Sequence, residues 1–145
     1  MQLMKTHSLQ EFQKTAENFV SNLSPSSQKA VVVGLYGNLG AGKTTFTQAV
    51  AKSLGVEETV TSPTFVIEKI YELTNQKFSH LIHIDAYRLE KSEELLHLGW
   101  QKIISDSKNL ILIEWPDRVL DIMPRHIQVK LTHLSENERQ IEIEY

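Results

Sequence analysis

The sequence has no cysteine among its 145 residues, which excludes disulfide bonds, thiol catalysis and cysteine-ligated metal sites. It also lacks any apolar run approaching the roughly 18 residues of a membrane-spanning helix. Residues 1–10 contain one lysine and no apolar segment, so they do not resemble a secretory signal. These absences predict a cytoplasmic protein with no membrane partner.

Positive charge is scarce as well, with 15 Lys and Arg against 18 Asp and Glu and a formal net charge of −3. Tight, direct binding of nucleic acid is therefore not predicted as the main activity, because it requires a basic surface. The composition, 41% hydrophobic and 23% charged, is that of a globular protein. The length suits one domain with a sizeable core, so we expect residues 1–145 to form a single domain.

A glycine-rich motif, GNLGAGKT, occupies residues 37–44 and fits the phosphate-binding pattern G-x-x-x-x-G-K-[ST]. A β-branched apolar run precedes it, and apolar residues at helical spacing follow it as far as Gly55, where a helix end is expected. In such a strand–loop–helix unit, backbone N–H groups and the helix N-terminus hold phosphate. Lys43 would reach the β- and γ-phosphates, and the Thr44 hydroxyl would bind Mg²⁺. The predicted nucleotide-binding residues are Asn38, Leu39, Gly40, Ala41, Gly42, Lys43, Thr44 and Thr45.

Two further helices are expected from apolar periodicity. Residues 8–23 have an apolar face, and Ser8 with Glu11 matches a capping box. A core helix without chemistry is the more common outcome for such a segment, and the alternative is that its start borders the nucleotide base. Residues 92–105 are the second helix, which Gly99 interrupts or ends.

Strands are expected at 31–36, 65–72, 78–84, 110–113, 126–131 and 139–145. The second and third are joined by so short a turn that they must run antiparallel. By contrast, the fully apolar run LILI at 110–113 is typical of a central parallel strand. The predicted fold class is therefore α/β, a three-layer P-loop NTPase-like fold with a mixed, mainly parallel central sheet.

Two acidic residues stand at the ends of apolar strands, where ligands of α/β sheets bind. Asp85 follows LIHI and Glu114 follows LILI. A phosphate loop needs an acidic residue to fix Mg²⁺ before it can support hydrolysis. A solvated carboxylate at a strand end is the plainer alternative for each, but the motif at 37–44 favours a function for both.

Four other residues have more than one possible role. His83 shares a strand face with Asp85, yet a core histidine with satisfied ring nitrogens is the more common outcome. Arg88 suits phosphate charge or a surface ion pair, and Trp115 suits a base, a partner or the core. Thr64, in the polar loop after the predicted nucleotide-binding helix, suits a γ-phosphate-sensing switch or a plain turn.

Together these segments closely resemble one family. The signature is GNLGAGKTTFTQ at 37–48, TSPTF at 61–65, HIDAYRL at 83–89 and EWPDR at 114–118. It is similar to TsaE, also called YjeE, the P-loop ATPase of bacterial tRNA threonylcarbamoyladenosine (t6A) biosynthesis. The resemblance covers nearly the whole chain, in the family's order and spacing.

The resemblance implies an Mg²⁺-dependent ATPase that is slow without its partners and does not itself transfer the threonylcarbamoyl group. It implies work with TsaD-like and TsaB-like proteins on tRNAs that read ANN codons, with tRNA reached only through that complex. Carried over by motif, Lys43 binds phosphate and Thr44 and Glu114 bind Mg²⁺. Asp85 becomes the catalytic or Mg²⁺-linked carboxylate, and Thr64 a catalytic residue of the switch loop.

Three alternative functions follow from the residues, and none of them is favoured. A small-molecule or nucleotide kinase would use the same phosphate loop, but such kinases usually carry an arginine-rich lid, and this chain has only four arginines. A non-enzymatic module in which ATP props up a binding surface is disfavoured by Asp85 and Glu114. A GTPase is less expected still, because the guanine-reading motif Asn-Lys-x-Asp is absent.

Overall fold

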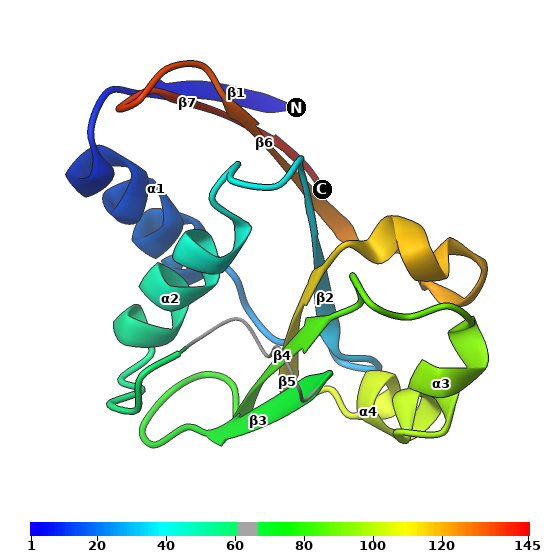
Figure 1. The fold of residues 1–145 in the computed structure, drawn as a ribbon. Helices are drawn as coiled ribbons and strands as arrows, with labels where there is room; N and C mark the ends of the chain where they lie inside the picture. The colour runs from blue at the N-terminus through cyan, green and yellow to red at the C-terminus, as the bar shows by residue number, and fades with distance from the viewer. Residues whose placement is uncertain (61–66) are drawn as a thin grey trace.

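A computed structural model describes residues 1–60 and 67–145 of the chain. Their elements in chain order are β1 (Gln2–Thr6), α1 (Leu9–Ser21), β2 (Val31–Tyr36), α2 (Lys43–Ser53), β3 (Glu68–Glu72), β4 (His80–Asp85), α3 (Ser92–Leu96), α4 (Trp100–Ser105), β5 (Asn109–Glu114), the 3₁₀ helix η1 (Pro116–Ile122), β6 (Ile127–His133) and β7 (Arg139–Glu144). The strands form one seven-stranded sheet in the order β1-β7-β6-β2-β5-β4-β3. Helices α1 and α2 cover one face, and α3, α4 and η1 cover the other (Figure 1).

The sheet has a parallel centre and antiparallel edges. Strands β6, β2, β5 and β4 run parallel to their neighbours in this group. At one edge β3 pairs antiparallel with β4, and at the other β7 pairs with β6 and β1 with β7, both antiparallel. This arrangement confirms the three layers and the mixed central sheet predicted from the sequence. Because β2, β4 and β5 are parallel, their carboxyl ends lie side by side at the same end of the sheet.

Strand β5 divides its side chains between two hydrophobic cores. Leu110 and Leu112 pack into the cluster under α1 and α2, whereas Ile111 and Ile113 pack into the cluster under α3 and α4. All six residues of β5 are buried. Burial on both faces explains why this strand is a continuous apolar run rather than an alternating one.

Helix ends follow the predicted signals with one change. The Ser8 hydroxyl accepts from the Glu11 N–H at 3.1 Å, as a capping box requires. The Glu11 carboxylate, however, accepts from the His7 N–H at 2.7 Å instead of that of Ser8, so the reciprocal half of the predicted box is wrong by one residue. Gly55, at φ +84°, closes α2, and Gly99, at φ +83°, separates α3 from α4.

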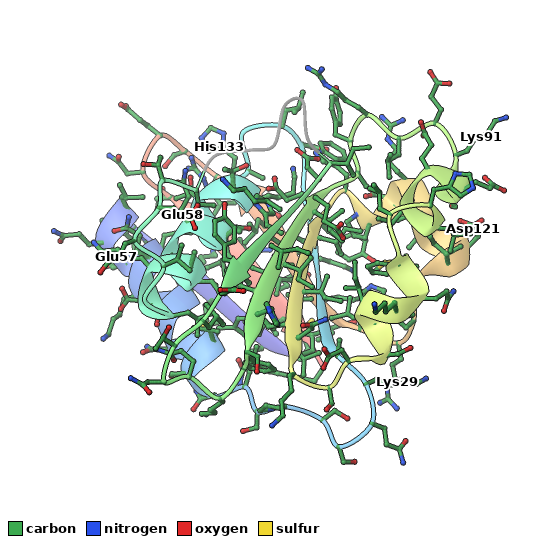
Figure 2. All side chains as sticks on the ribbon, turned by 90° about the horizontal axis from the view of Figure 1, so that it is seen from below. Lys29, Glu57, Glu58, Lys91, Asp121 and His133 are labelled. Carbon is green, nitrogen blue, oxygen red and sulfur yellow. The ribbon has the colours of Figure 1, made fainter. Side chains whose placement is uncertain are left out.

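Strand β1 was not predicted. It pairs with β7 from Gln2↔Ile143 to Thr6↔Arg139, but most of its side chains are exposed, so its sequence has no clear alternation. Charged side chains such as Lys29, Glu57 and Lys91 lie at the periphery of the molecule (Figure 2). Among the described residues, none of the helices has both the length and the apolar composition needed to cross a bilayer.

Candidate functional site

The phosphate-loop motif forms the connection between β2 and α2, as predicted. Gly37, Gly40 and Gly42 have φ values of +152°, +80° and +108°. Gly42 is the N-cap of α2, and no side chain within the described residues caps its first turn. The N-terminal N–H groups of a helix without a side-chain cap are available to an anion, and the helix dipole favours negative charge there.

Two glycines of the loop give a matched test of its tight backbone. A Cβ atom at Gly37 would lie 2.6 Å from the Leu131 carbonyl oxygen, whereas one at Gly40 would meet no atom within 4 Å. We expect Gly40→Ala to lower the free energy of unfolding by about 1 kcal/mol through its positive φ alone. Gly37→Ala should cost roughly 1–3 kcal/mol more because of the clash. Urea unfolding of both variants measures the difference, and equal losses would contradict the close approach to β6.

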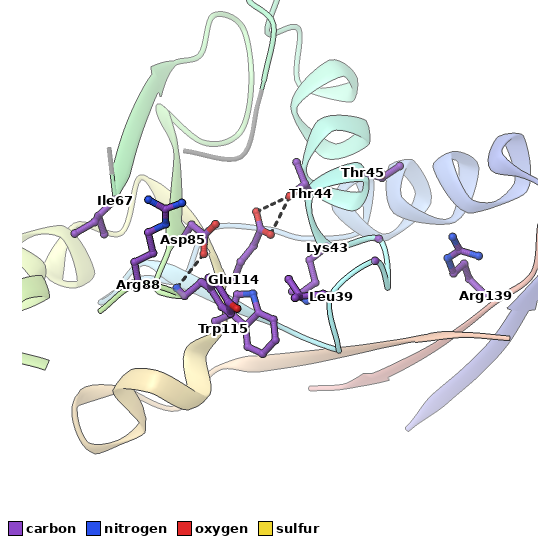
Figure 3. A pocket seen from close by; sticks show the side chains of 13 residues that line it. Leu39, Lys43, Thr44, Thr45, Ile67, Asp85, Arg88, Glu114, Trp115 and Arg139 are labelled. Carbon is purple, nitrogen blue, oxygen red and sulfur yellow. Dashed lines mark hydrogen bonds between the residues drawn. The ribbon is translucent and has the colours of Figure 1, made fainter. Parts of the chain in front are cut away.

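A cleft of about 590 Å³ opens beside this loop, over the carboxyl ends of β4 and β5 (Figure 3). It is lined by Leu39, Gly40, Gly42, Lys43, Thr44, Thr45, Ile67, Asp85, Tyr87, Arg88, Glu114, Trp115 and Arg139. Thus most of the predicted phosphate-loop residues and both predicted carboxylates face one cavity. Asn38 and Ala41 lie on the other side of the loop, beside Lys130 and Leu131.

Lys43 is a nearly buried cation, with 5% of its surface exposed. Its Nζ donates to the carbonyl oxygens of Gly37 at 2.5 Å and Asn38 at 3.0 Å, and lies 4.2 Å from the centre of the Trp115 ring. Burial lowers the pKa of Lys43, and the negative charges of Glu114, Asp85 and Asp117 oppose that shift less strongly. A partly desolvated cation at the mouth of the loop is a strong attractor for an anionic ligand.

Glu114 joins the phosphate loop to the sheet. The Thr44 hydroxyl donates to its carboxylate oxygens at 3.0 and 3.3 Å, and Nε2 of His83 lies 2.6 Å from its Oε2. Only 3% of Glu114 and none of His83 is exposed. The predicted carboxylate at the end of β5 is therefore part of a buried polar chain that starts on α2.

Asp85 lies directly beside Glu114, because the two residues are register partners at the ends of β4 and β5. Its Oδ1 accepts from the Tyr87 N–H at 3.0 Å. Two carboxylates and the Thr44 hydroxyl form a set of oxygen ligands, which suits Mg²⁺ rather than a softer metal. Within the described residues there is no cluster of three or more His, Cys, Asp or Glu that could hold a metal.

Trp115 lies at the cleft rather than wholly in the core. Its backbone is left-handed (φ 59°, ψ 48°), an uncommon state for a non-glycine residue, and costs about 1–3 kcal/mol. Its ring stands 4.9 Å from that of Tyr87, and the Arg118 guanidinium lies 5.5 Å from the Tyr87 ring. The two rings pack against each other, and Lys43 lies over the Trp115 ring.

Several lining residues were not predicted, namely Ile67, Tyr87 and Arg139. Tyr87 follows Asp85 by two, and no motif of the sequence marks it as a site residue. Arg139 begins a terminal strand, and only the sheet order brings it beside the cleft. Arg88 lines the cleft, which favours a role in the site over a distant surface ion pair. Thr64 lies outside the described residues.

Comparison with known proteins identifies close relatives. The model of the family "Threonylcarbamoyl adenosine biosynthesis protein TsaE" matches residues 6–141. The tRNA threonylcarbamoyladenosine biosynthesis protein TsaE of Rickettsia typhi is 36% identical over 135 residues, covering 92% of this chain and 88% of the relative. The protein of that name from Borreliella burgdorferi is 40% identical over 98 residues, 68% and 69% of the two chains.

A solved structure shows the same fold. The crystal structure of Bacillus subtilis YdiB superposes with a TM-score of 0.75 and 27% identity. The match covers 97% of this chain and 82% of that one. With the strand–loop–helix unit and the mixed sheet described above, this similarity confirms the predicted α/β fold class.

Proposed function

The chain belongs to the TsaE family of threonylcarbamoyl adenosine biosynthesis proteins, and we propose that it binds and hydrolyses ATP with Mg²⁺ in the t6A modification of tRNAs that read ANN codons. In this proposal it acts with TsaD-like and TsaB-like proteins and does not itself transfer the threonylcarbamoyl group. The observation that carries the proposal is the convergence of Lys43, Thr44 and Glu114 on one cleft. The net charge of −3 supports contact with tRNA only through the complex.

The phosphates of ATP lie along the loop from residue 38 to residue 45 in this proposal. Backbone N–H groups and the start of α2 bind them, and Lys43 exchanges its two carbonyl contacts for phosphate oxygens. Phosphate is the better partner for this cation because it carries charge, whereas the carbonyl oxygens do not. The Trp115 ring then borders the nucleotide from the side of the sheet.

Thr44, Glu114 and Asp85 would hold Mg²⁺ together with its waters. Their adjacency at the ends of two parallel strands and the Thr44–Glu114 hydrogen bond support this assignment. When bound, Mg²⁺ supplies positive charge against the phosphate oxygens as the γ-phosphoryl group leaves. The chain's own part is to hold the two carboxylates in place beside Lys43, so that the triphosphate binds in one geometry.

The adenine base is assigned to a smaller pocket of about 130 Å³ that adjoins the cleft. Gly42, Thr45 and Arg139 line both cavities, and the start of α1 completes the pocket with Ser8 and Leu9. Backbone and hydroxyl groups here can hydrogen-bond a base edge, and Phe12 supplies apolar surface. The sequence favours a core helix without chemistry for residues 8–23, and this proposal adopts the alternative that its start borders the base.

Reconstitution of the modification tests the proposal. TsaD-like and TsaB-like proteins, threonylcarbamoyl donor, ATP and an ANN-reading tRNA are incubated with and without the chain, and t6A is measured in digested tRNA by mass spectrometry. We expect multiple turnovers of t6A formation only in the reaction that contains the chain. Equal t6A in both reactions would contradict the proposal. A parallel incubation with ATP and a panel of nucleosides and sugars should yield no phosphorylated product, and such a product would favour the rival kinase.

A further inference from the structure

We propose that His83 is a positioning residue, which fixes the Glu114 carboxylate in the orientation that the metal–nucleotide site requires. This inference rests on the proposed function, because it gives His83 a role in the binding of Mg²⁺ and ATP. Four observations carry it: the length of the His83–Glu114 contact, the burial of both residues, the state of the second ring nitrogen, and the place of His83 on β4.

The contact is short and shielded from water. Nε2 of His83 lies 2.6 Å from Oε2 of Glu114, and both side chains are almost wholly buried. A hydrogen bond that involves an ionised group is stronger and shorter than a neutral one, and low surrounding polarity strengthens it further. Such a bond restricts the side-chain torsions of Glu114 more firmly than the two longer bonds from Thr44.

The strand places His83 for this task. His83 precedes Asp85 by two residues on β4, so both side chains lie on the same face. The register of β4 against β5 sets His83 opposite Leu112 and Asp85 opposite Glu114. His83 therefore contacts Glu114 diagonally, from the core side, and leaves the cleft side of the carboxylate to Thr44 and to a ligand.

The ring of His83 differs from that of a structural histidine. The Thr44 hydroxyl donates to Glu114, and an ionised Glu114 would take the Nε2–H of His83 as its second donor. The buried Nδ1 atom has no hydrogen-bond partner within the described residues. The His126 ring, by comparison, has both nitrogens paired, with the Tyr36 hydroxyl and the Pro124 carbonyl, each at 2.8 Å. Within the described residues His83 is therefore not the core histidine with two satisfied ring nitrogens that the sequence favoured.

His83 therefore acts on the site by orienting the Glu114 carboxylate, and it does not itself contact the substrate. Residues that hydrogen-bond to metal ligands typically change metal affinity or activity by about 10–100-fold when removed. Without His83, the side-chain hydrogen bonds left to the Glu114 carboxylate among the described residues would be those from Thr44. Those contacts come from the phosphate loop itself, so the carboxylate would follow the loop instead of the sheet.

Three substitutions at His83 and one control test the proposal. His83→Gln keeps an N–H donor near the position of Nε2, whereas His83→Asn places its amide near Nδ1, out of reach of Glu114. His83→Leu removes the donor altogether. Leu81→Ala removes buried apolar surface two residues earlier on the same face of β4, away from Glu114. Binding of a fluorescent ATP analogue is titrated with and without Mg²⁺, and thermal unfolding is followed for each variant.

We expect the Leu and Asn variants to bind the analogue without Mg²⁺ within about twofold of the unmodified chain. The Mg²⁺ concentration that gives half of its effect on binding should rise roughly 10- to 100-fold in both. The Gln variant should return this concentration to within about threefold. Leu81→Ala should lower the unfolding temperature and leave the Mg²⁺ requirement unchanged, because a lost core contact alone does not move it.

An unchanged Mg²⁺ requirement in the Leu variant, or an equal shift in Leu81→Ala, would overturn the inference. If the Leu variant does not fold, the Gln and Asn variants decide, since equal requirements in the two would overturn it as well. An unmodified chain that binds no ATP would instead contradict the proposed function, and the inference would fall with it.

Discussion

Replacement of Lys43 by methionine is expected to weaken ATP binding on the order of 100-fold, from the loss of a charge-assisted hydrogen bond to phosphate. Lys43 is nearly buried at the mouth of the loop, between the carbonyl oxygens of Gly37 and Asn38 and the Trp115 ring. Methionine keeps the length of the side chain and its contact with the ring but not its charge. Equilibrium binding of ATP, measured by isothermal titration calorimetry, tests the expectation.

The matched control is Lys52→Met, which removes a lysine from the exposed last turn of the same helix. It should leave the dissociation constant unchanged. Because burial lowers the pKa of Lys43, its charge opposes folding at neutral pH. The Lys43→Met protein should therefore unfold at the same temperature as the unmodified chain or a higher one. Unaltered ATP affinity in a folded Lys43→Met protein would remove Lys43 from the site.

Glu114→Gln is expected to reduce hydrolysis by on the order of 1,000-fold, because charge stabilisation at a metal–phosphate site is worth several kcal/mol. The amide is nearly isosteric, and its oxygen can accept from His83 while its N–H donates to the Thr44 hydroxyl, so the fold should be kept. ATP binding without Mg²⁺ should stay within a few-fold of the unmodified chain, because Lys43 and the loop are intact. Phosphate release in the presence of the partner proteins measures the first effect, and calorimetry the second.

Glu144→Gln serves as the control, since Glu144 also ends a strand but is exposed and does not line the cleft. Its hydrolysis should equal that of the unmodified chain. Retention of full hydrolysis by Glu114→Gln would refute the assignment of Glu114 to Mg²⁺.

The features predicted well from the sequence are those with a local signal. The loop at 37–44 has a specific glycine and lysine spacing, and the uninterrupted apolar run of β5 indicates burial on both faces. Asp85 and Glu114 could be named as candidates because ligands of α/β sheets bind at the carboxyl ends of strands, and the register that makes them neighbours came from the structure. The strands after residue 67 were predicted to within a few residues, because each is an apolar or alternating run in the sequence.

The features that were missed depend on long-range contacts. Strand β1 has few buried side chains and forms by pairing with β7, which lies more than a hundred residues away. Arg139 reaches the cleft only because β7 lies two strands from β2 in the sheet. The place of Trp115 follows from its left-handed backbone after β5, which no residue pattern indicates for a non-glycine residue. The choice between core and site for His83 required the distance to Glu114.

The most direct test of the account is Mg²⁺-dependent release of phosphate from ATP by the chain in the presence of TsaD-like and TsaB-like proteins and tRNA. The account predicts release that requires Mg²⁺, exceeds that of the partners alone, and disappears when Glu114→Gln replaces the unmodified chain. Release that is the same with the chain, with its Glu114→Gln variant or with neither would contradict the claim that this cleft hydrolyses ATP.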